Sequence, residues 1–118
     1  MSDFHRTDRI ASEVQRELSQ LLRSSVKDPR INDVSITAVR VTRDLGHAKI
    51  YFLVPEGVES EEVQQVLNRA ANFLRNALGK ALQLRVVPKL TFFHDDSIAN
   101  GVKLTALIEK AVAKDADQ

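Results

Sequence analysis

Cationic side chains gather in one part of this sequence, where they could contact phosphate groups. Positions 69 to 89 hold Arg69, Arg75, Lys80, Arg85 and Lys89 and no acid, whereas positions 56 to 62 hold Glu56, Glu59, Glu61 and Glu62 and no cation. The formal net charge is only +1, so the sequence predicts a positive and a negative face rather than a basic molecule. Cations that face a nucleic acid supply affinity by displacing its counterions. The plainer alternative is that both groups lie on solvated surfaces.

Residues that commonly perform catalysis or bind metals are present, but they are not arranged for either role. His5, His47 and His94 are scattered along the chain and lack the spacing of metal ligands. Asp95 and Asp96 could bind magnesium or exchange protons. A helix cap is the favoured interpretation of this pair, because Ser97 and a helical pattern follow it.

Several classes of enzyme are excluded by what the chain lacks. It has no cysteine, which rules out disulfides, zinc–thiolate sites and cysteine nucleophiles. Its serines lack a Gly-x-Ser-x-Gly context, and Gly46, Gly57, Gly79 and Gly101 are too far apart to form a phosphate-binding loop. We therefore expect a protein that is not an enzyme and that uses no cofactor and no metal.

The length of 118 residues predicts a single domain over 1–118, with a core at about 6–112 and frayed ends. Apolar residues make up 43% of the chain, enough to form a core, and charged residues make up 28%, which suits a soluble surface. The N-terminus is polar, and the longest apolar run, 50–55, is too short to span a bilayer. We expect a cytoplasmic protein without a membrane partner.

The basic residues must be positioned by a mixture of helices and strands. An amphipathic helix is predicted over 6–26 from the apolar stripe Ile10, Val14, Leu18, Leu21 and Leu22. It ends at Asp28, because the residue before a proline is pushed out of helical geometry. The opposite side carries Arg9, Arg16, Arg23 and Lys27, which form either an ordinary soluble surface or further phosphate contacts.

Two strands are predicted next, over 34–42 and 47–54, from β-branched residues in alternation with polar ones. The alternation slips near Ala38-Val39, which indicates a bulge or a twist. Gly46 lies in the short connection and can adopt the positive φ that a tight hairpin loop requires. Strands joined by so short a loop pair in antiparallel fashion.

A second long helix is predicted over 60–82, with Ser60 as its cap. Asn72 and Gly79 weaken this helix, so we expect a bend or break within 70–80. A third strand is predicted over 85–93, with Pro88 near its start or on an edge, and a last helix over 98–112. The third strand must reach the sheet through a helical crossover.

The expected architecture is therefore α+β, in the order α-β-β-α(kinked)-β with a further C-terminal helix. Helices cover one face of a three-stranded mixed sheet and leave the other face for solvent or a partner. Phe52 and Phe92 are expected in the core. A platform that stacks bases requires Tyr51 or Phe93 to point outward, so we expect recognition of shape and phosphate with little reading of bases.

A series of short motifs in the sequence is more specific in its order than any one motif alone. They are Arg6-x-x-Arg9-Ile10-x-x-Glu13, Lys27-Asp28-Pro29-Arg30, Arg43-Asp44-Leu45, Ala48-Lys49-Ile50-Tyr51, Phe73-Leu74-Arg75, Leu78-Gly79-Lys80, Leu84-Arg85-x-Val87-Pro88-x-Leu90-x-Phe92 and Asp95-x-Ser97, with Gly101 downstream. In this order and spacing, over roughly residues 5–112, the chain resembles the ribosome-binding factor A family.

The resemblance implies a type II KH-like fold that lacks the Gly-x-x-Gly loop of ordinary KH domains. The family has instead an interhelical kink with an Ala-x-Gly pattern, which corresponds here to Ala70-Ala71-Asn72. Asn72 thus replaces a glycine. Asparagine is the next most tolerant residue of left-handed geometry, which favours retention of the kink.

The resemblance also implies a ribosome assembly factor. Members bind the free small (30S) ribosomal subunit and its 16S rRNA near the decoding region, assist late maturation including 5′-end processing, and are needed most in the cold. It implies a functional link to assembly GTPases, and we expect this chain to be a monomer. The alternative is an α+β protein-interaction module without RNA binding.

We expect the RNA-binding residues to be cations that contact phosphates. The main candidates are Arg43, Arg75, Lys80, Arg85 and Lys89, with Arg9 and Arg16 in a secondary role and Ala70 and Asn72 forming the interhelical kink. The main candidates are expected to meet on one exposed side, where the second long helix reaches the third strand.

Overall fold

The helices and strands follow one another in the predicted order, with one short helix added. A computed structural model describes residues 2–96, with side chains from residue 6 onward. The elements are α1 (Ser2–Ser24), α2 (Pro29–Asn32), β1 (Ser35–Val41), β2 (His47–Leu53), α3 (Ser60–Arg69), α4 (Ala71–Leu82) and β3 (Lys89–His94). The sequence did not predict α2. The helix predicted over 98–112 lies outside the described residues.

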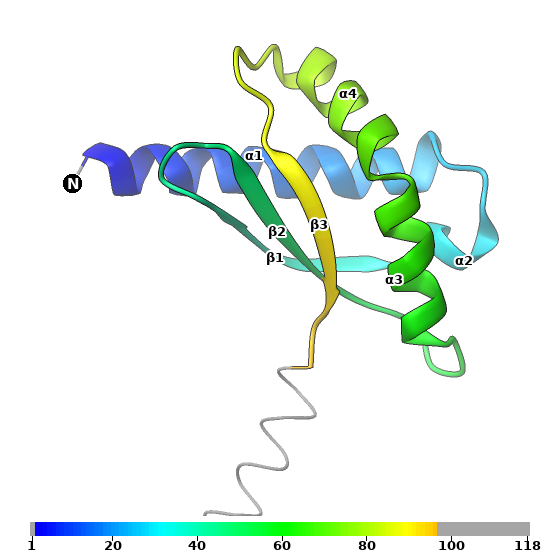
Figure 1. The fold of residues 1–118 in the computed structure, drawn as a ribbon. Helices are drawn as coiled ribbons and strands as arrows, with labels where there is room; N and C mark the ends of the chain where they lie inside the picture. Colours follow the sequence, from blue (N-terminus) through cyan, green and yellow to red (C-terminus); the bar gives the residue numbers. More distant parts are fainter. Residues whose placement is uncertain (1, 97–118) are drawn as a thin grey trace, which may run out of the picture.

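The three strands form one mixed sheet in the order β1-β2-β3 (Figure 1). β1 and β2 pair in antiparallel fashion, and the register shifts between Ile36 and Ala38, which confirms both the hairpin and the predicted bulge. β3 runs parallel to β2, with Ile50 opposite Phe92 and Tyr51 opposite Phe93. The parallel pairing requires a crossover, and α3 and α4 supply it.

The hydrophobic core lies between the helices and one face of the sheet. α1 crosses behind the strands in Figure 1 and buries Val14, Leu18 and Leu22. Alternate strand residues, among them Ile50 and Phe92, point into the same core, as predicted for Phe52 and Phe92. Because strand side chains alternate, the residues between them point to the opposite face, which we call the open face.

The long helix predicted over 60–82 breaks at Ala70, within the expected range. Ala70 has φ −86° and ψ 0°, and its N–H donates to the carbonyls of Val66 and Leu67 at 3.1 Å, which closes α3. Asn72 lies in the first turn of α4, and no residue of 70–72 has a positive φ. The expectation that left-handed tolerance at Asn72 keeps the kink is therefore wrong, because the break uses ordinary right-handed geometry.

The third strand begins at Lys89 rather than at residue 85, because the preceding residues are held against α4 as a loop. Gln83 ends α4 in left-handed geometry, with φ 52°. The guanidinium of Arg75 donates to the Val87 carbonyl through Nε at 3.1 Å and Nη2 at 2.9 Å. A Cβ added to Gly79 would lie 2.6 Å from Cγ2 of Val87. Gly79 therefore permits close packing and does not break the helix.

The β1–β2 connection turns at Leu45, not at the predicted Gly46. Leu45 has φ 60°, and Gly46 is absent from the residues with positive φ. The Asp44 carboxylate organises the turn, since its Oδ1 accepts hydrogen bonds from Thr42 Oγ1 at 2.7 Å and from the Gly46 N–H at 2.9 Å. These bonds hold the pKa of Asp44 below its usual value, with the Thr42 hydroxyl as the largest cause.

Candidate nucleic-acid interface

One end of the molecule gathers most of the predicted cations. The β1–β2 connection lies beside the start of β3, where the Lys89 N–H donates to the Gly46 carbonyl at 2.9 Å, and the 83–88 loop joins that start to the end of α4. Exposed cations come from all of these segments. We call the set Arg43, Lys80, Arg85 and Lys89 the basic end.

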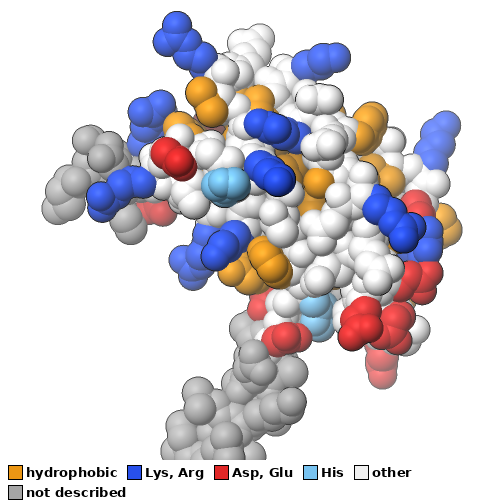
Figure 2. Space-filling view, viewed as in Figure 1, with side chains coloured by type: hydrophobic (Ala, Val, Ile, Leu, Met, Phe, Trp, Pro, Cys, Tyr) orange, Lys and Arg blue, Asp and Glu red, His pale blue; other side chains and the backbone are white. Residues whose placement is uncertain are grey.

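No described acid forms an ion pair with a cation of the basic end. The ion pairs among the side chains of residues 6–96 are those of Arg30 with Asp28 and Glu62, and of His94 with Asp96. In Figure 2 acids gather at the lower right near the start of α3, whereas cations are spread over the top, the left and the right edge of the face, with acid also present among those on the left. The predicted gathering of acids is therefore visible on this face, whereas the cations are more widely spread.

Arg75 differs from the other cations that the sequence singled out. Its side chain is half-buried, and both donors described above point at the Val87 carbonyl. This geometry makes Arg75 an anchor for the 83–88 loop. Its guanidinium is therefore already engaged with the backbone, unlike the side chains of the basic end.

Arg9 and Arg16 lie on a different surface. Both are exposed on α1, on the side opposite the buried Val14 and Leu18. α1 packs against the covered face of the sheet, so these two arginines point away from the strands. They cannot share a flat partner surface with residues of the open face.

The open face carries Arg40 and Lys49, which were not among the predicted RNA-binding residues, together with Tyr51 and Phe93, the rings that a stacking platform requires to point outward. β1 and β2 place Arg40 opposite Lys49, and the neighbouring row runs from Ala38 through Tyr51 to Phe93. Arg40 and Lys49 are exposed, and Phe93 is 38% exposed despite being a large apolar residue. The i, i+2 spacing of Lys49 and Tyr51 indicates that both residues lie on the same face of β2. The sequence alone does not show whether the helices cover that face or leave it open.

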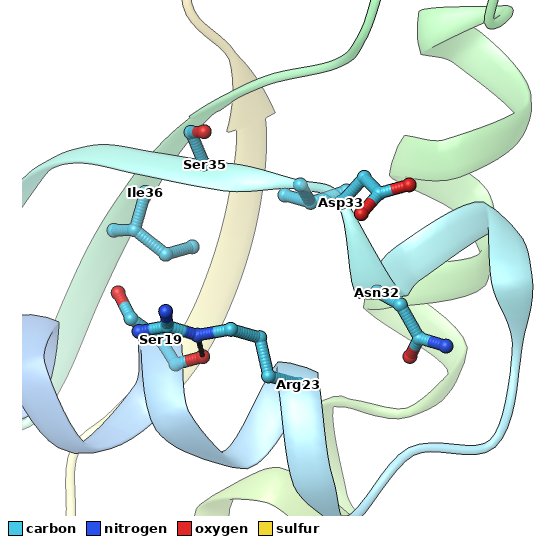
Figure 3. A pocket seen from close by; sticks show the side chains of 7 residues that line it. Ser19, Arg23, Asn32, Asp33, Ser35 and Ile36 are labelled. Atoms are coloured by element: carbon cyan, nitrogen blue, oxygen red, sulfur yellow. Dashed lines mark hydrogen bonds between the residues drawn. The ribbon is translucent and has the colours of Figure 1, made fainter.

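A surface hollow of about 350 Å³ lies between α1 and the start of β1 and is lined in part by Ser19, Arg23, Asn32 and Asp33 (Figure 3). Arg23 Nε donates to the Ser19 carbonyl at 3.3 Å, and Ser19 Oγ donates to the Gln15 carbonyl at 2.7 Å. These polar groups thus serve α1 itself. Within the described residues no cluster of His, Cys, Asp and Glu could hold a metal ion.

Comparison with known proteins identifies the family. A family model described as ribosome-binding factor A matches residues 6–108. The chain belongs to the ribosome-binding factor A family. It is 53% identical over 116 residues to ribosome-binding factor A of Pseudomonas fluorescens strain Pf-5, covering 96% of this chain and 87% of that protein. The relative in Pseudomonas putida strain F1 is also 53% identical, with 96% and 88% covered.

Solved structures of ribosome-binding factor A have the same KH-like α+β fold. The crystal structure from Thermus thermophilus superposes with a TM-score of 0.67 at 25% identity, covering 75% of this chain and 94% of that one. A second Thermus thermophilus structure, a homology model fitted into a map of a 30S complex, gives a TM-score of 0.62 at 26% identity, with 73% and 91% covered. The predicted fold and family are thereby confirmed.

Some residues that carry the likeness to ribosome-binding factor A serve the fold. Asp28 caps α2, because its Oδ1 accepts from the Arg30 N–H at 2.9 Å. The Arg30 guanidinium then bridges Asp28 and Glu62 of α3, at 2.8 and 2.6 Å. Hydrogen bonds from Arg30 hold the pKa of the Asp28 carboxyl below its ordinary value, and they raise the pKa of Arg30.

Proposed function

We propose that this chain is a ribosome assembly factor that binds the free 30S subunit and its 16S rRNA. In this proposal it assists late maturation, including 5′-end processing, and it acts in the cytoplasm as a monomer with a role in growth in the cold and a functional link to assembly GTPases. The relatives named as ribosome-binding factor A support it, and so does the similar structure fitted into a 30S complex. No helix of the described residues is long and apolar enough to cross a membrane.

The physical argument for this proposal is the exposed positive charge of the basic end. Arg43, Lys80, Arg85 and Lys89 are exposed and none forms an ion pair with a described acid, so they can neutralise phosphates and release counterions. Such contacts position a protein on folded RNA without reading its sequence. By binding one arrangement of an rRNA junction better than another, the protein would shift the junction toward that arrangement.

Charge reversal at the basic end tests this function. We expect Arg85→Glu/Lys89→Glu to lose most of its co-sedimentation with purified 30S subunits through sucrose, whereas Lys27→Glu, also exposed, serves as a charge-reversal control away from the basic end. Circular dichroism checks that each variant is folded. Arg75 is unsuitable for this test, because its replacement would release the loop that holds Arg85. Unchanged pelleting of the double variant would remove the basic end from the interface.

The secondary candidates require their own variant. Arg9 and Arg16 lie on α1, away from the strands, so Arg9→Glu/Arg16→Glu reports whether a second surface contacts the subunit.

A salt titration distinguishes the alternative function, a protein-interaction module without RNA binding, from the proposed one. RNA binding weakens steeply as salt rises, because counterions released into a more concentrated salt solution gain less entropy.

A further inference from the structure

The open face carries a pair of neighbouring aromatic rings beside cations that form no ion pair with a described side chain. The rings of Tyr51 and Phe93 lie with centroids 5.9 Å apart and planes 31° apart, on neighbouring strands. Arg40 and Lys49 face each other in the next row of the sheet, and neither is in an ion pair with a described side chain. Phe93 is 38% exposed and Tyr51 is half-buried, so part of this apolar ring surface faces solvent and is available to a partner.

A hollow next to Tyr51 enlarges the surface that a flat ligand could contact. It measures about 270 Å³ and is lined by Ala38, Arg40, Tyr51 and Asp95. Asp95 is held at its rim, where it accepts a hydrogen bond from the Thr37 hydroxyl. The hollow therefore lies directly beside the Tyr51 residue that forms one half of the aromatic pair.

We propose that the open face binds unpaired nucleotides of RNA, with a base stacked on the Tyr51–Phe93 pair and its phosphates on Arg40 and Lys49. Lys49 and Tyr51 are two residues apart on β2, about 7 Å along the strand, which suits a phosphate and a base of one short stretch of chain. Bases stack on aromatic rings whatever their sequence, and cations beside the rings follow the backbone. A peptide partner would need a continuous apolar groove, whereas here cations interrupt the apolar surface.

This inference shares with the proposed function only the assumption that the partner is RNA, and it concerns a surface other than the basic end. Lys89 lies at the border of the two, since it starts β3 and also points outward. Folded rRNA would then be held at the basic end by its phosphates, while an unpaired segment lies across the sheet.

The chain contains its own reporter for the experiment. Tyr51 is the only tyrosine and there is no tryptophan, so ultraviolet emission of the protein comes from the open face. We expect single-stranded decauridylate to quench this emission on titration into the full chain, and an RNA duplex of the same length to quench it much less. Emission that responds to neither probe, at concentrations that saturate labelled decauridylate, overturns the inference.

Variants separate stacking from general attraction to RNA. Measured by anisotropy of labelled decauridylate, Phe93→Ser is expected to weaken binding about tenfold, the loss of roughly one stacked base. Tyr51→Phe keeps the ring and should retain affinity. Phe73→Ser is the matched control, since Phe73 is 55% exposed but lies on α4. Equal affinity of Phe93→Ser and wild type, or a loss confined to Phe73→Ser, contradicts the proposal.

Co-sedimentation with 30S subunits keeps the two proposals apart. Wild-type protein that pellets with 30S but shows no quenching by decauridylate overturns the open-face site and leaves the proposed function standing. Protein that is quenched by decauridylate but does not pellet with 30S supports the site and contradicts the function.

Discussion

Arg30 and Arg75 are cations whose contacts stabilise the fold. Arg75 fastens the 83–88 loop to α4, and Arg30 joins α2 to α3 through Asp28 and Glu62. Charge alone does not distinguish such residues from Arg85 or Lys80, which have no described partner. The distinction appears only when the acceptor groups are placed in space, because a backbone carbonyl leaves no signal in sequence.

The Asp28 carboxylate should make stability depend on pH in the acid range. Its pKa is lower in the folded chain than its ordinary 3.8, so its contribution is complete above pH 3.8 and is lost as pH falls through the folded value. Asn also caps helices, so Asp28→Asn removes the charge and keeps the cap. Thermal unfolding should show a wild-type advantage near neutral pH that shrinks as the pH falls below 3.8 and through the folded pKa.

The matched background for this measurement is Arg30→Ala. Hydrogen bonding to Arg30 is the largest cause of the lowered pKa, so the effect of Asp28→Asn should shrink in that background. An equal effect in both backgrounds would show that Arg30 is not the partner that matters in solution.

Gly79 should be intolerant of the smallest possible side chain. Alanine favours a helix over glycine by about 1 kcal/mol, but overpacking costs roughly 1–3 kcal/mol. Val87 is β-branched and stiff, so it cannot easily yield to a Cβ at 2.6 Å. We expect Gly79→Ala to destabilise the fold by about 1 kcal/mol in urea unfolding.

The sign of the Gly79→Ala effect should reverse once Val87 is trimmed. In a Val87→Ala background the clash is gone, and Gly79→Ala should stabilise the chain by up to about 1 kcal/mol. A stabilising Gly79→Ala in the wild-type background would contradict the close contact.

At the scale of the elements, α3 protects the outer edge of β3. Asn68 Nδ2 donates to the Phe92 carbonyl at 3.2 Å and its Oδ1 accepts from the Phe92 N–H at 2.9 Å. Gln64 Oε1 accepts from the His94 N–H at 2.9 Å. Two side-chain amides thus take the place of a fourth strand, and an edge that could otherwise pair with another chain is closed.

Removal of the Asn68 amide should weaken this edge locally. Asn68→Ala leaves both Phe92 backbone groups without their partner, which should cost about 1 kcal/mol and speed hydrogen exchange at the Phe92 amide. Gln65→Ala, an exposed neighbour on α3, is the control and should leave that amide protected. Unchanged exchange in Asn68→Ala would mean that water or the sheet satisfies the edge equally well.

The element order was predictable from sequence because periodicity and turn residues agree along most of the chain. The hairpin, the bulge near Ala38 and the break between α3 and α4 all left such signals. The start of β3 left no such signal, because Val86 and Val87 are typical strand residues. In the structure, contacts of Val87 with Arg75 and Gly79 hold this segment against α4 as a loop. The outward direction of Phe93 was equally hidden, since Phe92-Phe93 is apolar at both positions and does not fix the phase of the strand.

At the scale of the whole molecule, positive charge is divided between the basic end, the open face and the outer side of α1. The family likeness and the charge segregation predicted the first and the last, whereas the open face required coordinates. A net charge of +1 nevertheless gives local regions of positive potential, because the acids gather near α3.

Salt dependence should distinguish the phosphate-binding surfaces from the stacking surface. For RNA binding, log K falls as log salt rises, and each lost phosphate contact makes this negative slope shallower by about 0.7–0.9. We expect Arg85→Ala to make the slope shallower by about that amount, while Phe93→Ser lowers affinity and leaves the slope unchanged. A slope altered by Phe93→Ser would place the ring near phosphate rather than base.

The attachment of the 83–88 loop to α4 has a thermodynamic consequence for any partner. A loop that is held in one shape before it binds loses little conformational freedom on association, so Arg85 in the loop and Lys89 directly after it would reach a ligand as a rigid template. If Val87 were freed, the same charges would remain but would first have to be ordered, and complex formation would acquire an entropic penalty visible in calorimetry as a less favourable TΔS.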